Sequence, residues 1–337
     1  MDSATAATSK PGIARDVGLE QLRRIVDHAR RAPSVHNTQP WRWQAAGSTL
    51  ELWADRERAL PVSDPLGRNL VISCGAALHH TVVAAQALGA DAAVEQLPDG
   101  PDSDLMARLV LGPGKPTDEA LDRLEQLRRR RTDRRRFTSW PVPEENLHHL
   151  AETGATWGAT VLAVTDRGLR LQIEDLLEDA RRRQQADPRI AEETETWIDH
   201  GREDGVPTQV LPQFQGARGE RPSRFGSGLT PGTAEPVIRG TDGVLVLSTV
   251  DDGALSWLHV GASLSALWLQ AAGNGLSIVP LSQLVEVAHT RIALQQLLEP
   301  PARVPQILVR VGWQEIGRDE LPRTPRRMLD DVLSQKH

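Results

Sequence analysis

One stretch of the 337-residue chain, RRAPSVHNTQPWRW at positions 30–43, gathers short polar side chains between two prolines. Pro33 and Pro40 disfavour the α conformation in the residue before each of them, so the stretch is predicted to be a constrained loop that follows a helix. Its hydrogen-bonding side chains include a short serine and two amides, Ser34, Asn37 and Gln39. These side chains could hydrogen-bond to a planar polar ligand. The alternative is that the loop only caps the helix and connects it to the next strand, without binding a ligand.

A dense run of arginines, RRRRTDRRRF, occupies positions 128–137. Like charges one turn apart on a helix repel each other, and the dipole at a helix C-terminus would favour only the first few of them. A phosphate dianion is a counter-ion that fits, because guanidinium groups bind it bidentately and Thr132 can donate its hydroxyl. Arg323, Arg326 and Arg327 near the C-terminus could reach the same anion, or they could form a charged flexible tail.

The composition excludes several classes of protein. A net charge of −6 argues against general nucleic-acid binding, so the arginines need a local explanation. The single cysteine, Cys74, rules out an internal disulfide and a multi-cysteine metal site, and we expect a cytoplasmic protein. We expect no apolar tract long enough to span a bilayer. Residues 1–12 lack the apolar region of a signal peptide.

Common catalytic and metal-binding motifs are missing from the sequence. It has no Walker loop, no G-x-G-x-x-G after a strand and no His-Glu-x-x-His. The histidines at 79–80, at 148–149 and at 36 lack metal-type spacing with acidic partners, so no metal site is predicted.

Hydrophobic periodicity predicts alternating helices and strands. Two helices that are apolar nearly all round, 67–88 and 254–272, are expected to be buried. Further helices are expected at 17–31, at 117–127 with Thr117 as its cap, at 169–183 and 282–298, and from Pro143 onward. Strands are expected at 41–45, 49–54, 92–97, 105–111, 160–164, 241–250 and 304–311. The proline-punctuated stretch 184–239, with a short helix near 191–200, is expected to be a lid or disordered.

The two halves of the chain repeat each other. The apolar helices read CGAALHHTVVAAQALG and VGASLSALWLQAAGNG, and a gapless alignment puts Gly75 on Gly261, 186 residues later. Each helix is followed by a strand that ends in glycine, but Gly112 and Gly312 are 200 residues apart. The second half therefore carries an insertion, attributed to the helix at 282–298. Chance similarity of two Ala-rich helices is the alternative.

The halves differ where chemistry is expected. Only the first has the polar loop, only the second is preceded by the arginine run, and only the second has LSIVPLSQ after its apolar helix. Each half lacks what the other supplies, which predicts a fused pseudo-dimer with one composite site.

These motifs resemble those of the flavin-dependent nitroreductases. RRAPSVHNTQPWRW resembles their APSxxNxQPW motif, and RRTDRRRF resembles their arginine-rich phosphate-binding segment. Together with GLSIVPLSQ and TPRRMLDDVL, they look like the Acg-type nitroreductase-like proteins from about Val17 to Val332. The resemblance implies an α+β nitroreductase-like fold of two fused homologous halves, with sheets flanked by helices and with buried central helices. The implied halves are 15–128 and 129–337, with 184–239 as an inserted lid over the flavin.

The resemblance also implies a composite FMN site. From the first half, Ser34 and Asn37, with Gln39 beside them, match the loop that contacts the flavin. The arginine run holds one arginine more than the family's segment, so its register is open by one residue. The other implied contacts are Arg130, Arg131, Thr132 and Arg134 on the phosphate side, Pro280, Leu281 and Ser282 near flavin N5, and Arg323 and Arg326 on a closing arm.

The implied activity is that of an FMN-dependent oxidoreductase. Hydride from NAD(P)H would pass through flavin N5 to a nitro or quinone-type acceptor, without a catalytic side chain. The alternative is an FMN storage or sequestration protein with a lidded flavin and little reductase activity, as suggested for Acg-type proteins. An internal pseudo-dimer needs no partner chain, so we expect a monomer without nucleic-acid or membrane partners.

Overall fold

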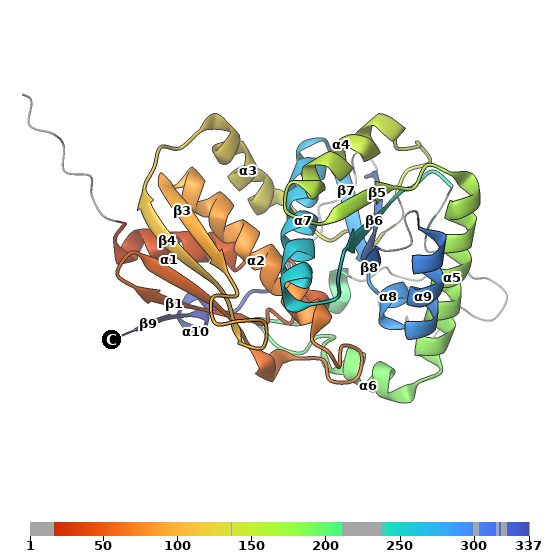
Figure 1. The fold of residues 1–337 in the computed structure, drawn as a ribbon, viewed down its shortest axis with the longest axis horizontal. Coiled ribbons are helices and arrows are strands. Elements are labelled where there is room, and N and C mark those ends of the chain that lie inside the picture. Colours follow the sequence, from red (N-terminus) through yellow and green to blue (C-terminus); the bar gives the residue numbers. More distant parts are fainter. Residues whose placement is uncertain are drawn as a thin grey trace, which may run out of the picture.

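Two β-sheets, each with its own helices, are joined at the centre of the molecule by two long helices (Figure 1). The structure is a computed structural model that describes residues 17–135, 137–210, 238, 240–298, 303–314, 317 and 322–336. Its mixed helices and strands, with sheets flanked by helices, confirm the predicted α+β fold class.

The first sheet has the strand order β3-β4-β2-β1-β9, antiparallel except for the β1–β9 pair. Its strands are β1 (Trp41–Ala46), β2 (Thr49–Ala54), β3 (Ala90–Gln96), β4 (Leu105–Pro113) and β9 (Leu333–Gln335). The helices that share its core are α1 (Leu19–Ala29), α2 (Arg68–Ala87) and α3 (Asp118–Arg129). Thr117 caps α3 as its spacing predicted, because its hydroxyl oxygen accepts from Ala120 N–H at 3.1 Å.

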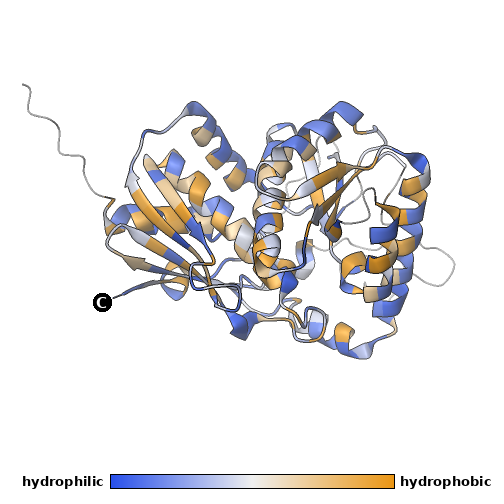
Figure 2. Ribbon diagram, in the orientation of Figure 1, coloured by the Kyte–Doolittle hydropathy of each residue, from blue (hydrophilic) through white to orange (hydrophobic). Residues whose placement is uncertain are grey.

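The second sheet has the order β5-β6-β8-β7 and is antiparallel throughout. Its strands are β5 (Thr160–Ala163), β6 (Gly243–Thr249), β7 (Leu276–Leu281) and β8 (Val304–Trp313). The helices around it are α4 (Glu144–Ala155), α5 (Arg167–Gln185), α7 (Ala254–Gly273), α8 (Gln283–Glu286) and α9 (Ala288–Leu297). Every residue of β6 is buried, and apolar residues dominate the strands of this sheet in Figure 2.

Helices α2 and α7 cross in direct backbone contact. A Cβ atom on Gly75 would lie 2.1 Å from the carbonyl oxygen of Leu258, and one on Gly261 would lie 1.9 Å from that of Ile72. Only glycine allows two helix backbones to approach this closely. The same two glycines are those that the repeat aligned.

Two segments cross from the second sheet to the first. The C-terminal segment 322–336, here called the arm, contains α10 (Leu329–Val332) and adds β9 to the first sheet. After α5 the chain continues through α6 (Pro188–Thr196), at the bottom of Figure 1, to residues 197–206, here called the strap. Both carboxylate oxygens of Glu193 accept from backbone N–H groups, those of Val62 and Ser63, at 2.8 and 2.9 Å. The rest of the predicted lid, 211–237 and 239, lies outside the described residues.

Two predictions about the second half are wrong. The stretch 282–298 is not one helix, because Val287 adopts an extended conformation and separates α8 from α9. The preceding LSIVPL is strand β7, which the sequence analysis missed. Pro280 lies within β7, and proline is tolerated there because β7 is an edge strand of its sheet.

The expectation that no tract is long enough to cross a bilayer is also corrected. Helix α2 has 20 residues, and the mean hydropathy of its most apolar window is 1.4, which suffices by length and composition. However, 94% of that window is buried inside the protein, as in any central helix of a core, so the indication of a membrane span is weak.

We predict that Gly261→Ala destabilises the protein by about 3 kcal/mol, because the added methyl group would overlap the carbonyl of Ile72. The change is measured as a shift of the urea unfolding midpoint. Gly112→Ala is the control, since a Cβ on Gly112 meets nothing within 4 Å. Equal losses in the two variants would show that the helix crossing is not tightly packed.

Candidate functional site

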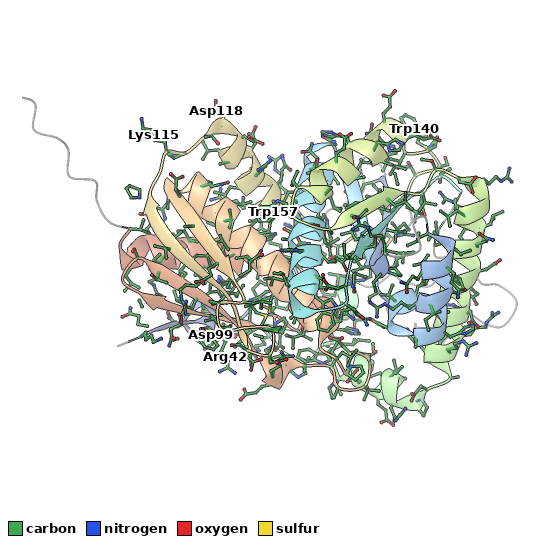
Figure 3. The ribbon with its side chains drawn as sticks, viewed as in Figure 1. Arg42, Asp99, Lys115, Asp118, Trp140 and Trp157 are labelled. Carbon is green, nitrogen blue, oxygen red and sulfur yellow. The ribbon has the colours of Figure 1, made fainter. Side chains whose placement is uncertain are left out.

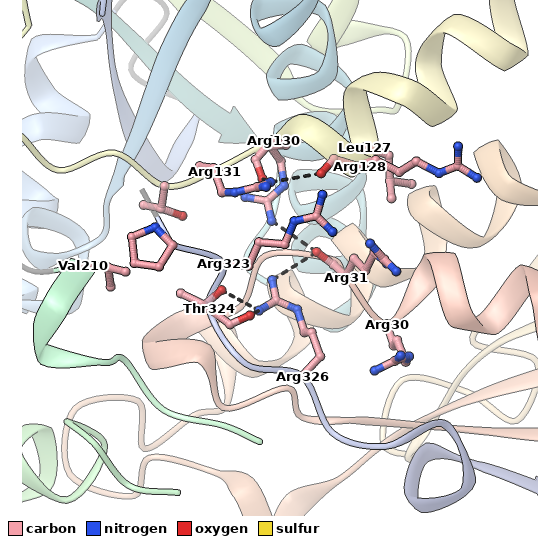
Figure 4. Close-up of a pocket in the computed structure, with 12 residues that line it drawn as sticks. Arg30, Arg31, Leu127, Arg128, Arg130, Arg131, Val210, Arg323, Thr324 and Arg326 are labelled. Carbon is pink, nitrogen blue, oxygen red and sulfur yellow. Dashed lines mark hydrogen bonds between the residues drawn. The ribbon is translucent and has the colours of Figure 1, made fainter. Parts of the chain in front are cut away.

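Seven arginines line one cavity of about 210 Å³ where α1, α3 and the arm meet (Figure 4). They are Arg30, Arg31, Arg128, Arg130, Arg131, Arg323 and Arg326. The wall is completed by Leu127, Thr132, Val210, Pro322 and Thr324. None of these lining residues is acidic. We call this space the first arginine cavity.

Arg130 and Arg326 are the most enclosed of these cations. Burial, together with the positive charges of nearby arginines, lowers the pKa of each guanidinium to about 9. No ion pair joins either of them to a carboxylate of the described chain. A buried cation without a counter-ion is costly, so the cavity is suited to an anion.

The contacts of Arg130 leave part of its guanidinium available. Its Nη2 donates to the carbonyl oxygen of Arg31 at 3.1 Å, and the group lies 4.6 Å from the ring centroid of Trp268. Its Nε and Nη1 have no hydrogen-bond partner among the described residues, although Arg130 is only 7% exposed. Phosphate oxygens are acceptors that such groups bind strongly.

Arg326 is held by uncharged acceptors. Its Nη1 donates to the side-chain oxygens of Asn37 at 3.0 Å and Thr324 at 2.6 Å, and its Nη2 donates to Arg31 O at 3.2 Å. Neutral acceptors fix the direction of the guanidinium but do not cancel its charge. Arg326 therefore remains a positioned cation at the cavity.

The arginine run divides after Thr132. Arg131 Nη1 donates to the carbonyl oxygens of residues 128–130 at 2.8–3.0 Å, which caps the C-terminal end of α3. Of the four residues implied for the phosphate side, the structure brings Arg130, Arg131 and Thr132 together at the cavity. Arg134 is not among the lining residues. Burial lowers the pKa of Arg134 to about 10, and the charge of Asp133 opposes that shift.

The polar loop has a strained backbone. His36, Asn37 and Gln39 have φ values of 47°, 55° and 50°, a left-handed conformation that is uncommon for residues other than glycine. Ser34 stabilises it, because its hydroxyl oxygen accepts from Gln39 N–H at 3.0 Å. Ser73 of α2 also accepts from Val35 N–H, at 3.2 Å. Such strain concentrates at functional sites.

Asn37 and Gln39 bind the strap and the arm. Asn37 Nδ2 donates to Gly205 O at 2.8 Å and to Pro325 O at 3.1 Å. Gln39 Nε2 donates to Glu203 O at 2.8 Å, and its Oε1 accepts from Arg327 N–H at 2.9 Å. The two amides implied for the flavin are thus engaged by chain segments in this structure.

A charged cluster also holds the strap. One carboxylate oxygen of Asp204 pairs with Arg58, and the other lies 2.8 Å from His200 Nδ1. The Arg58 guanidinium lies 5.4 Å from the ring centroid of Trp197. The Trp197 and His200 rings stack 4.5 Å apart. Burial raises the pKa of Asp204, but hydrogen bonds from His200 and Arg58 outweigh burial and keep it low. The carboxylate therefore stays ionised.

The implied residues Pro280, Leu281 and Ser282 lie elsewhere. Pro280 and Leu281 pair with β8, and the Ser282 carbonyl begins α8. None of the three is among the lining residues of the first arginine cavity. Glu286 of α8 nevertheless reaches α2, because its side chain accepts from Asn69 Nδ2 at 2.9 Å.

Seven lining residues of the cavity were not among the FMN contacts implied by the sequence: Arg30, Arg31, Leu127, Arg128, Val210, Pro322 and Thr324. Arg30 and Arg31 directly precede the Ala-Pro-Ser of the polar loop, so their sequence position was the available signal. Val210 lay in the predicted lid and had no signal of its own. No group of three potential metal ligands occurs among the described residues.

Comparison with known proteins gives a consistent result, although no protein-family model matches the chain. "Putative NAD(P)H nitroreductase Rv3131" of Mycobacterium tuberculosis is 36% identical over 321 residues, which is 93% of this chain and 91% of that protein. "Putative NAD(P)H nitroreductase acg" of the same species is 33% identical over 332 residues, covering 94% and 96%. "Probable NAD(P)H nitroreductase PigM" of a Serratia strain is 25% identical, covering 95% and 94%.

Among solved structures, the chain is similar to the "putative nitroreductase" of Anabaena variabilis with a TM-score of 0.50. The match covers 91% of this chain and 93% of that one at 10% identity, so it shows the fold alone.

We predict that the double variant Asn37→Ala/Gln39→Ala frees the strap and part of the arm, because it removes their side-chain hydrogen bonds to the loop. Hydrogen exchange at residues 199–206 should accelerate at least tenfold, consistent with losing several bonds of about 1 kcal/mol each. Gln44→Ala on β1 is the control, since its side chain has no hydrogen bond to a described residue. Unchanged exchange would mean that the Asp204 cluster and the backbone hydrogen bond from Gly205 N–H to Asn37 O hold the strap without the two amides.

Proposed function

We propose, from the premise that the chain belongs to the NAD(P)H nitroreductase family that includes Acg, that it binds FMN and acts as an oxidoreductase. The observation that carries the cofactor is the first arginine cavity, in which two enclosed cations, Arg130 and Arg326, form no ion pair with a carboxylate of the described residues. A phosphate dianion supplies the missing charge, and the partnerless Nε and Nη1 atoms of Arg130 fit its oxygens.

Each part of the site would have a separate task. Arg130 and Arg326 would hold the phosphate, with Arg131, Thr132 and Arg323 beside them. Ser34 keeps the loop in its strained conformation, so that Asn37 and Gln39 would face the flavin when the strap moves away. Arg134, Pro280, Leu281 and Ser282 are retained as proposed contacts from the family resemblance.

Bound FMN would supply two-electron transfer from NAD(P)H to a nitro or quinone-type acceptor. The protein would contribute binding, orientation and exclusion of water, and no side chain need form a covalent bond. The absence of a required nucleophile fits the surroundings of Cys74, because burial raises the pKa of its thiol far above the ordinary value.

We also propose that the chain consists of two fused halves, 15–128 and 129–337, and works as a cytoplasmic monomer. Support comes from matched contacts between α2 and α7: Gly75 meets Leu258, and Gly261 meets Ile72. Gly261 lies 186 residues after Gly75, and Leu258 lies 186 residues after Ile72, which is the offset of the repeat.

Storage of FMN is the second candidate function. It is favoured by one observation, the hydrogen bonds that tie Asn37 and Gln39 to the strap. A strap that stays in place over bound flavin would keep NAD(P)H away from it.

We predict that Arg130→Gln and Arg326→Gln each weaken FMN binding 10- to 100-fold, because each removes a charge-assisted contact worth about 1.5–3 kcal/mol. Binding of riboflavin, which lacks the phosphate, should change less than threefold. Dissociation constants from flavin fluorescence quenching measure both. Arg123→Gln is the control, since Arg123 is an exposed residue of α3 whose one ion pair among the described residues is with Glu119. FMN affinity at the wild-type level in both variants, and in Arg131→Ala, would place the phosphate elsewhere.

The two functions are separated by anaerobic reduction of the purified protein. An oxidoreductase should show its flavin absorbance bleached by NADH or NADPH within seconds to minutes. A storage protein should be bleached by dithionite but not by either nicotinamide, and Asn37→Ala/Gln39→Ala should then restore nicotinamide reduction. A colourless protein that also fails to bind added FMN would refute both functions.

A further inference from the structure

The ring of Trp268 lies beside Arg130, the enclosed arginine at the end of α3. Trp268 belongs to α7 and is 2% exposed, and the Arg130 Cζ lies 4.6 Å from the centroid of its ring. The face of a tryptophan ring is the negative part of its quadrupole and attracts a cation, most strongly where water is excluded. The ring therefore stabilises a charge that burial opposes.

This contact attracts Arg130 without taking its remaining hydrogen-bond donors. Nη2 donates to Arg31 O at 3.1 Å, just beyond α1, whereas Nε and Nη1 have no acceptor among the described residues. A carboxylate in the same place would have cancelled the charge and accepted from these donors. An aromatic ring does neither, so Arg130 is held from two sides while part of its guanidinium stays available to a ligand.

Two carboxylates are potential partners of the same guanidinium. Glu125 and Asp133 line a second cavity of about 510 Å³, whose wall also includes Arg130 and Trp268. Both carboxylates are paired with other arginines, at 2.8 and 2.7 Å, and neither forms an ion pair with Arg130. Trp268 lines this cavity and not the first arginine cavity, so its ring attracts Arg130 on the side where the carboxylates lie. The tryptophan thus offers the guanidinium an alternative to an internal ion pair.

The two central helices differ at this position. The gapless alignment of the repeat puts Trp268 on Val82 of α2, which is also buried. An aliphatic side chain therefore fills the equivalent place in the half that has no arginine run before it. The aromatic ring is present in α7, where Arg130 lies next to it.

We propose that Trp268 positions Arg130 for the phosphate of the flavin, an inference that rests on the proposed function. Its ring keeps the guanidinium from pairing with Glu125 or Asp133, so that Nε and Nη1 can donate to phosphate oxygens. A group that is already in place loses less entropy when the ligand arrives, which raises affinity. Trp268 acts through Arg130, so it is a positioning residue and not a catalytic one.

The test is a graded series at position 268. Trp268→Phe keeps a smaller ring, and Trp268→Leu keeps apolar bulk without a ring face. Flavin fluorescence quenching on flavin-free protein measures the dissociation constants of FMN and riboflavin for each variant. We expect FMN affinity to fall about two- to fivefold in Trp268→Phe and about tenfold or more in Trp268→Leu, because the attraction weakens with the ring. The affinity for riboflavin, which lacks the phosphate, should change less than about threefold in both.

A double-mutant cycle with Arg130 distinguishes positioning from packing. In the Arg130→Gln background, Trp268→Leu should change FMN affinity less than about twofold, because the cation on which the ring acts is gone. Trp157→Leu is the control, since the half-buried Trp157 ring packs against His79, with ring centroids 4.7 Å apart, and FMN affinity should stay at the wild-type level. If Trp268→Leu does not fold, Trp268→Met replaces it with the same expectations.

The outcomes separate this inference from the function on which it rests. A loss of FMN affinity that requires Arg130 and spares riboflavin supports the inference. FMN binding by the wild type that is unchanged in Trp268→Leu overturns the inference alone. Equal losses of FMN and riboflavin, or a loss that persists in the Arg130→Gln background, also overturn it, because they show that the ring only fills the core. Wild-type protein that binds neither flavin overturns the proposed function, and this inference with it.

Discussion

The backbone contact of α2 with α7 at Gly75 and Gly261 is the constraint on which the rest of the structure depends. Because each helix belongs to the core of one sheet, the contact fixes how the sheets face each other. One turn further along both helices, His79 Nδ1 lies 2.8 Å from the Ser265 hydroxyl, and Trp157, labelled in Figure 3, packs edge-on against His79. Beside this contact, the polar loop meets arginines from α1, from the end of α3 and from the arm, and Arg326 of the arm donates to Asn37 of the loop.

Burying the charges of these arginines costs free energy when the protein folds, and the same charges allow the folded site to bind an anion. Arg130 and Arg326 both donate to the carbonyl oxygen of Arg31, just beyond the C-terminal end of α1, where the helix dipole is negative. That partial charge helps the chain to fold without an anion, but it does not replace one. The pKa of Arg130 is lowered chiefly by burial and also by nearby arginines, and a bound anion would oppose both effects by stabilising the charged guanidinium.

Local signals predicted the features with strong periodicity or a fixed geometry. They identified α2, α7, the cap at Thr117 and the glycine pair, because each depends on nearby residues or on an internal repeat. They missed β7, since Pro280 argues against a strand unless the strand is known to be an edge. They also could not show that Asn37 binds the strap and the arm, because those partners are 168 and 288 residues away. The arginines at the cavity were recognised by type, but which of them line it depends on where α3 ends.

The arm has a consequence for the order of events as the protein is made. Arg326 bonds to Asn37 across 289 residues, and β9 pairs with β1 from the last residues of the chain. Contacts of such sequence separation form late, and during synthesis the N-terminal part emerges first. The loop at 34–39 therefore leaves the ribosome long before the arm that completes its site. Until residues 322–336 have been synthesised, the nascent first half exposes the edge of β1 and an unfinished cluster of arginines, so the site can be assembled only after the arm has been made.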